Sequence, residues 1–235
     1  WWIIIPFQAL CCILIEPLWT QTAIQVQYYF PSIKQKSIGR QAYIVKNMAK
    51  SVILMFLTMP ALWVINRIVL YNTWDSAFIK CLGSIYAASD IVAVVKMFDK
   101  LPFTTKIHHL RVVVFSIMNA TVLDYTDPKT IWRNLALLAA ASAPTYGVNA
   151  YLSLRCIDEI SLREKKRVAN FALSIYSFFL TFSMVYQSFA LVIFACTFPL
   201  SWDVYIYVMG VLLIFYDDWS LSIYLYEHSS CQKIK

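Results

Sequence analysis

The chain is poor in charged residues and in glycine. Asp, Glu, Lys and Arg together make up 14% of its 235 residues, hydrophobic residues make up 60%, and there are only four glycines. Soluble proteins carry about 25% charged residues, so this composition excludes an ordinary soluble domain and predicts an integral membrane protein. Scarce glycine leaves little scope for loops that cradle phosphate groups, and neither a P-loop nor GxGxxG occurs.

Motifs of common hydrolases, metal sites and disulfide scaffolds are missing as well. GxSxG, HExxH, HxxxH and CxxC do not occur, and four of the six cysteines fall in apolar runs. We therefore expect buried thiols and no cofactor or metal. The net charge of +7 comes with no basic stripe or aromatic RNA-binding motif. It favours attraction to anionic lipid headgroups and no nucleic-acid partner.

Seven apolar runs have about the length that a membrane span requires, roughly 20 residues. A closed barrel would alternate polar and apolar residues, and these runs do not. We predict an all-α, polytopic membrane protein with seven transmembrane helices. The first run has no basic start and is too long for the apolar part of a signal peptide, so we expect a retained span. The predicted spans are residues 2–25, 51–71, 76–98, 107–123, 131–154, 168–198 and 202–226.

The loops between these spans alternate in charge. Segments 30–50, 99–106 and 155–167 and the C-terminal tail are basic, whereas the other loops hold acids with a single lysine. By the positive-inside rule, the basic side is cytosolic or faces the mitochondrial matrix. The N-terminus then lies outside and the C-terminus inside, and the endoplasmic reticulum and the mitochondrial inner membrane fit equally well.

Ionisable side chains interrupt the apolar runs, mostly in the predicted inner half of the bilayer. A helix rises about 1.5 Å per residue, which places Asp90 roughly 12 Å below the inner surface. The neighbouring antiparallel span carries His108, His109 and Arg111, and we expect Asp90 to lie within hydrogen-bond or ion-pair reach of one of them. Charge inside a membrane is costly and marks functional candidates. The candidate lipid-binding residues are Asp90, His108, His109, Arg111, Ser142, Asn149, Asp217 and Asp218.

Three roles for this polar layer stay open: adhesion between helices, the polar end of a lipid or substrate cavity, and ion conduction. The histidines are adjacent, so their rings point about 100° apart on a helix. Helical metal sites usually use i,i+4 spacing instead. A general base and a hydrogen bond to a headgroup both remain open for His108 and His109.

Three short segments, taken in order, resemble the TLC domain. They are Tyr86–Asp90 (YAASD), Ile107–Leu110 (IHHL) and Leu137–Pro144 (LLAAASAP). Ceramide synthases, the translocating-chain-associating membrane protein and a set of lipid-homeostasis proteins share that domain. The resemblance implies a six-helix barrel around a lipid-accessible cavity. It covers residues 45–228, with 1–30 as an additional N-terminal helix and 229–235 as an inner tail.

The resemblance carries the family's histidine pair to His108 and His109 and its aspartate to Asp90. Ceramide synthases have an acidic motif in the following span, but residues 139–149 contain no acid here. We therefore favour a protein that binds or organises membrane lipid without catalysis. One alternative is an acyltransferase of the ceramide-synthase type that uses these three residues. Another is a structural accessory subunit of a large membrane complex, for example a mitochondrial one, with other membrane subunits as partners.

The expected cavity holds one ordered lipid. Pro60 and Pro144 interrupt two of the predicted spans, and the small residues 139–143 leave room beside the second proline. We expect the headgroup at the inner polar layer and the tail along the second, fifth and sixth spans.

Overall fold

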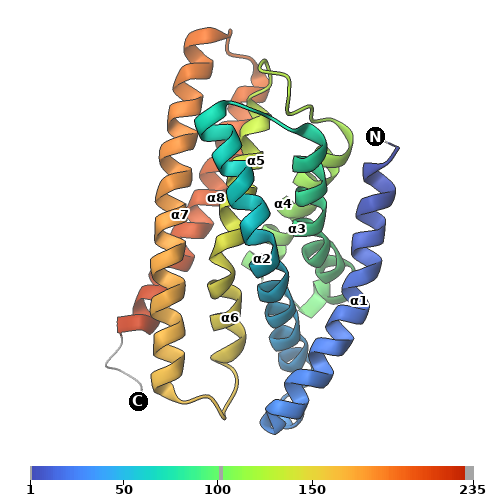
Figure 1. Cartoon of the computed structure of the whole chain (residues 1–235). Helices are drawn as coiled ribbons and strands as arrows, with labels where there is room; N and C mark the ends of the chain where they lie inside the picture. The colour runs from blue at the N-terminus through green and yellow to red at the C-terminus, as the bar shows by residue number, and fades with distance from the viewer. Residues whose placement is uncertain (1, 101–102, 231–235) are drawn as a thin grey trace.

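The computed structural model describes residues 2–100 and 103–230, and this part of the chain is helical with no strand (Figure 1). The predicted all-α class is therefore confirmed. The long helices are α1 (Ile4–Tyr29), α2 (Ile38–Tyr71), α3 (Ser76–Met97), α4 (Phe103–Thr121), α7 (Leu162–Thr197) and α8 (Trp202–Ser230). The short ones are α5 (Leu135–Ser142) and α6 (Tyr146–Leu154), with 3₁₀ turns η1 (Pro31–Gln35), η2 (Phe98–Lys100), η3 (Ile131–Asn134) and η4 (Ala143–Thr145).

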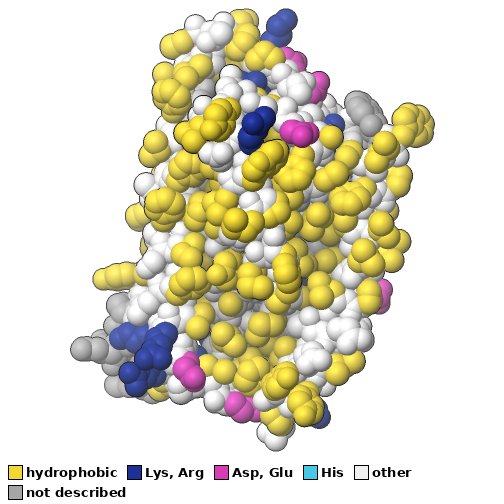
Figure 2. Space-filling model, in the orientation of Figure 1, with side chains coloured by type: hydrophobic (Ala, Val, Ile, Leu, Met, Phe, Trp, Pro, Cys, Tyr) yellow, Lys and Arg dark blue, Asp and Glu magenta, His cyan; other side chains and the backbone are white. Residues whose placement is uncertain are grey.

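The helices form one elongated bundle. Figure 1 shows α5 and α6 following each other as a single column beside α2 and α7, while α1 lies at the edge of the bundle. Helix α1 packs on α3, and α2 packs on α6. Hydrophobic side chains cover the middle of the face in Figure 2, and most charged side chains on that face lie towards its two ends. A belt of this kind is what contact with lipid requires.

Within residues 2–100 and 103–230, five helices are long and apolar enough to cross a membrane: α1, α2, α3, α7 and α8. They indicate an integral membrane protein. The other two predicted spans do not meet that description as single helices. Helix α4 has 19 residues and carries four ionisable side chains, Lys106, His108, His109 and Arg111, within its first half.

The predicted span 131–154 is not one helix. It divides into η3, α5, η4 and α6, with the break at Ala143–Thr145. Pro144 has no N–H to donate and its ring clashes with the preceding turn, so the chain tightens there, and the hydroxyl of Thr145 donates to the carbonyl of Ser142 (2.7 Å). Most of this column is buried by its neighbours. Broken helices are tolerated at membrane depth when protein surrounds them.

The predicted basic loop 30–50 is also shorter than expected. Helix α2 begins at Ile38, so Lys46 and Lys50 lie inside it and are buried rather than in a loop. Counting loop charges placed these two lysines in solvent, because the apolar run that follows them starts only at Ser51. The true loop retains Lys34 and Lys36, and Arg40 lies in the first turn of α2.

The loops before α2 and before α7 meet at one end of the bundle. Glu159 accepts hydrogen bonds from the backbone N–H and the hydroxyl of Ser32. Lys36 Nζ lies 2.8 Å from Asp158 Oδ2. These contacts join segments that are more than a hundred residues apart, and they place both basic segments on the same side of the apolar belt.

This arrangement predicts the sidedness of three positions. Cysteines introduced in place of Lys34 and Lys166 should react with a membrane-impermeant maleimide from one side of sealed vesicles. A cysteine in place of Lys129, in the loop between α4 and α5, should react from the other side. The unsubstituted chain gives the background of its native cysteines. Labelling of the first two positions from opposite sides would contradict the fold.

Candidate functional site

A cavity of about 150 Å³ lies inside the bundle between α2, α3, α4, α5 and α8. Most of its wall is apolar, with Leu57 and Val64 from α2 and Leu82 from α3 as examples. One water molecule needs roughly 10–15 Å³ by the same measure. The space is therefore sized for part of an organic molecule rather than for an isolated water.

The cavity is elongated and its polar groups are unevenly distributed. Its lining on α4 extends from His108 to Asn119, which corresponds to about 16 Å along the helix. At the far end, Asn119 accepts a hydrogen bond from the Tyr125 hydroxyl (2.8 Å) and donates one to the carbonyl of Lys80 (3.1 Å). These polar groups satisfy one another, so the far end offers a ligand mainly apolar surface.

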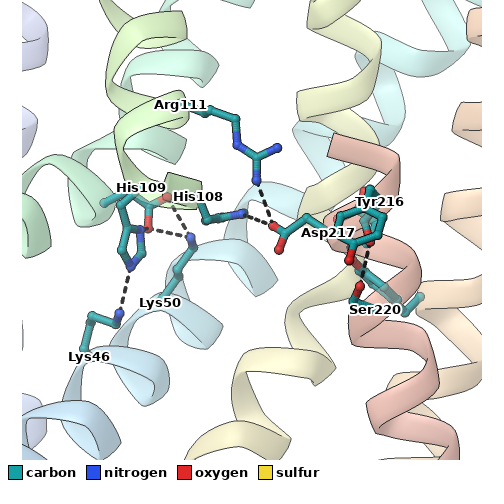
Figure 3. Close-up of polar contacts among 11 residues, drawn as sticks. Lys46, Lys50, His108, His109, Arg111, Tyr216, Asp217 and Ser220 are labelled. Atoms are coloured by element: carbon teal, nitrogen blue, oxygen red, sulfur yellow. Dashed lines mark hydrogen bonds and ion pairs between the residues drawn. The ribbon is translucent and has the colours of Figure 1, made fainter. Parts of the chain in front are cut away.

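The other end of the cavity, beside His108, carries ionisable groups on α4 and α8. His108 Nδ1 lies 2.8 Å from Asp217 Oδ2, and Arg111 donates to the same oxygen over 3.2 Å (Figure 3). Asp218 accepts a hydrogen bond from the Tyr176 hydroxyl of α7 (2.6 Å). His108, Arg111, Asp217 and Asp218 all line the cavity. Of the three side chains expected near Asp90, Arg111 pairs with Asp217 instead, because α4 presents it to α8.

A second cluster, around Asp90, is buried and does not line the cavity. Figure 3 shows its Lys46, Lys50 and His109. Lys50 Nζ donates to both carboxylate oxygens of Asp90 over 2.7 Å. His109 Nδ1 lies 2.9 Å from Asp90 Oδ1, as expected from the predicted depths. Among the described residues, Nδ1 of His109 has no partner with full hydrogen-bond geometry, so its contact with Asp90 is mainly electrostatic. Lys46 Nζ lies 3.0 Å from His109 Nε2.

The hydrogen-bond partners fix the protonation of His109. A lysine ammonium has donors only, so Nε2 must accept from Lys46 and the proton of the neutral ring is on Nδ1. That proton lies beside the Asp90 carboxylate. The cluster therefore joins α2, α3 and α4 around a single carboxylate that is 1% exposed.

The expected site residues thus fall into three groups. His108, Arg111, Ser142, Asp217 and Asp218 line the cavity, whereas Asp90 and His109 do not. Ser142 donates its hydroxyl to the carbonyl of Leu138 in its own helix (3.0 Å). The remaining candidate, Asn149, lies on α6 and is not part of the lining.

Three polar residues of these clusters were not among the expected ones: Lys46, Lys50 and Tyr176. Lys46 and Lys50 are four residues apart and so share one helical face. That spacing, beside the apolar residues Ile44 and Val45, was the signal that α2 begins before Ser51. Tyr176 sits in a long apolar run, where nothing in the sequence distinguishes it from an interface tyrosine.

Asp90, His108 and His109 also place one potential ligand atom each within 4.8 Å of one another. The donor set does not fit a metal ion, however. Lys50 already occupies both oxygens of Asp90, and Lys46 occupies Nε2 of His109. A divalent cation at this position would face two ammonium groups at close range, which is electrostatically unfavourable.

Comparison of the chain with family models, with curated proteins and with solved structures gives no match. The cavity, the ionisable groups that line it and the buried cluster around Asp90 are therefore the features that bear on function.

Because of this buried cluster, we expect substitution of Asp90 to lower the stability of the protein more than substitution of any other charged residue. Asp90→Asn should lower the free energy of unfolding by about 3–5 kcal/mol, because it leaves the buried ammonium of Lys50 unpaired. The matched control is Glu16→Gln, which breaks the exposed Glu16–Lys96 ion pair between α1 and α3. That change should cost less than about 1 kcal/mol. Denaturant titration of the purified protein in micelles measures both values.

A double variant separates loss of charge pairing from loss of packing. Replacing Asp90 with Leu and Lys50 with Met removes both charges, so it should recover much of the stability that Asp90→Asn loses. Equal, small effects of Asp90→Asn and Glu16→Gln would contradict the role assigned to the buried pair.

Proposed function

We propose that the chain is a TLC-like membrane protein that binds one amphipathic membrane lipid in its cavity without transforming it. In this proposal α2, α3, α4, the α5–α6 column, α7 and α8 form the six-helix barrel, and α1 is the additional N-terminal helix. The observation that carries the proposal is the division of the cavity into one ionisable end and a long apolar remainder. A lipid has the same division.

Two of the three spans expected beside the tail line the cavity, the second as α2 and the fifth as α5 and η4. The sixth span, α7, contributes no lining residue, and α3, α4 and α8 supply the rest of the wall. The small side chains of Ala139, Ala140 and Ala143 form part of this wall. They leave the space that a larger residue would fill, and the tail lies against them.

The headgroup meets Asp217, Asp218 and His108. Asp217 already faces two donors, whereas Asp218 accepts one hydrogen bond, from Tyr176. An ionised carboxylate can accept up to about four hydrogen bonds, so Asp218 has capacity for a headgroup donor such as a hydroxyl. Charged groups in a membrane interior are stabilised by such partners, and the ligand completes the polar end.

The proposed orientation follows the loop charges. The end that holds Lys34 and the start of α7 faces the cytosol or the mitochondrial matrix. The headgroup then lies towards the inner leaflet, at the level of Asp217 on α8.

Native mass spectrometry tests lipid binding. The purified chain should retain one lipid, and Ala139→Phe should lose it because the new ring occupies the cavity beside α5. Ala195→Phe is the matched control, since Ala195 is exposed on the outer face of α7. The control should retain the lipid, and both variants should unfold within a few degrees of the unsubstituted chain.

Two results would overturn the proposal. One is a chain that retains no lipid under conditions in which it stays folded. The other is equal retention in Ala139→Phe and the unsubstituted chain. Either result leaves the bundle as a scaffold, which is the role of an accessory subunit.

One observation favours a second function, general-base catalysis of acyl transfer. The span that follows the histidines has no acid, but the carboxylate of Asp217 on α8 lies 2.8 Å from Nδ1 of His108. An aspartate strengthens a histidine base by stabilising its imidazolium form. Here Arg111 already compensates the same carboxylate oxygen, which weakens that support. We therefore keep acyl transfer as the alternative.

The two functions differ in an enzyme assay. We expect no turnover of acyl-coenzyme A with a long-chain amine or alcohol acceptor by the purified chain. His108→Gln should then alter lipid retention alone. Turnover that is lost in His108→Gln and in Asp217→Asn, but retained in the control Ala195→Phe, would establish the catalytic alternative instead.

A further inference from the structure

The end of the bundle where α2 and α7 begin carries an excess of positive charge. In segments 31–40 and 158–167, seven basic side chains face only three acids. The exposed basic residues are Lys34, Arg40, Arg163, Lys166 and Arg167, with Lys36 and Lys165 half-buried beside them. We refer to these seven residues as the basic end.

The three acids of these segments are already committed to contacts within the protein. Asp158 pairs with Lys36, Glu159 accepts from Ser32, and Glu164 forms a capping box with Ser161 at the start of α7. Among the described ion pairs, Lys36 is the only member of the basic end that has a partner. Most of its positive charge is therefore uncompensated by the segments themselves.

Basic side chains of the two segments act on the same carboxylate, that of Asp158. The hydrogen bond from Lys36 lowers the pKa of Asp158, and the charges of Lys36, Lys165 and Arg40 lower it further. Arg40 belongs to α2 and Lys165 to α7, so cations from both helices surround one carboxylate. They act as a group rather than as separate surface charges.

Exposed apolar side chains lie among these cations. Ile38 is 78% exposed in the first turn of α2, and Leu162 is 61% exposed in the first turn of α7. Tyr28 and Tyr29, at the end of α1 next to η1, are exposed as well. Aliphatic and aromatic side chains interleaved with lysine and arginine are typical of the boundary between headgroups and acyl chains. A site for an acidic protein in water would not need to expose them.

We propose that the basic end is a second lipid site, on the outside of the bundle, that binds the phosphate of an anionic phospholipid. The cations of α2 and α7 hold the phosphate, and Ile38 and Leu162 contact the first part of the acyl chains. Each lysine or arginine near an anionic membrane surface contributes about 1 kcal/mol, which corresponds to about fivefold in affinity. This site is independent of the cavity, so either can fail without the other.

The test compares lipids on the full chain in neutral detergent. Short-chain phosphatidylglycerol should bind at least about tenfold more tightly than short-chain phosphatidylcholine. The triple variant Arg40→Gln, Lys165→Gln, Arg167→Gln should lose that preference. Lys129→Gln, an exposed cation at the opposite end, should keep it. The preference should also fall in high salt, because exposed charges are screened there.

Further probes identify the occupant. Leu162→Ser should weaken phosphatidylglycerol binding and leave any binding of inorganic phosphate unchanged, because only the lipid has an acyl chain to lose. Equal binding of the two lipids, or an unchanged preference in the triple variant, would overturn the proposal. Inorganic phosphate or polyglutamate that binds as tightly as phosphatidylglycerol would overturn the lipid assignment. Retention of a lipid in the cavity is measured separately with Ala139→Phe.

Discussion

The ion pair between Lys50 and Asp90 is the constraint on which the rest of the interior depends. Both groups are buried in a bundle whose surroundings are apolar, and the ammonium donates to both carboxylate oxygens over 2.7 Å. A charge left alone there would be very costly, so α2 and α3 are held in one register. His109 brings α4 to the same carboxylate. Because successive residues on a helix point about 100° apart, His108 and Arg111 then face α8 and the cavity.

The cavity follows from a second constraint, the break at Pro144. The column of α5 and α6 crosses the bundle as two short helices, and alanines dominate the wall that α5 and η4 contribute. Interiors are normally packed with few voids larger than water. A space with small residues along one wall and charged groups at one end only is the feature on which the proposed lipid ligand rests.

The sequence predicts the fold class and the polar residues of the site better than it predicts which of these residues pair with one another. Apolar run length identifies membrane helices because lipid contact demands it, and the inward polar residues Asp90, His109 and Asp217 fall in two clusters near one level. Hydropathy missed the early start of α2, since Lys46 and Lys50 look like loop charges until their partners are known. It also could not assign Arg111 to Asp217 rather than to Asp90, because the choice depends on which face α4 presents. Pro144 indicated the helix break within residues 131–154, but proline also occurs in continuous helices, as Pro60 does in α2.

The central claim is that the interior holds one lipid with its headgroup at the ionisable end. A density map of the full chain in lipid nanodiscs tests it most directly. We expect one elongated density along α2, α3 and α5, with its wider end within hydrogen-bond distance of Asp218 or His108. A cavity closed by its own side chains, or a density whose wider end lies beside Asn119, would contradict it.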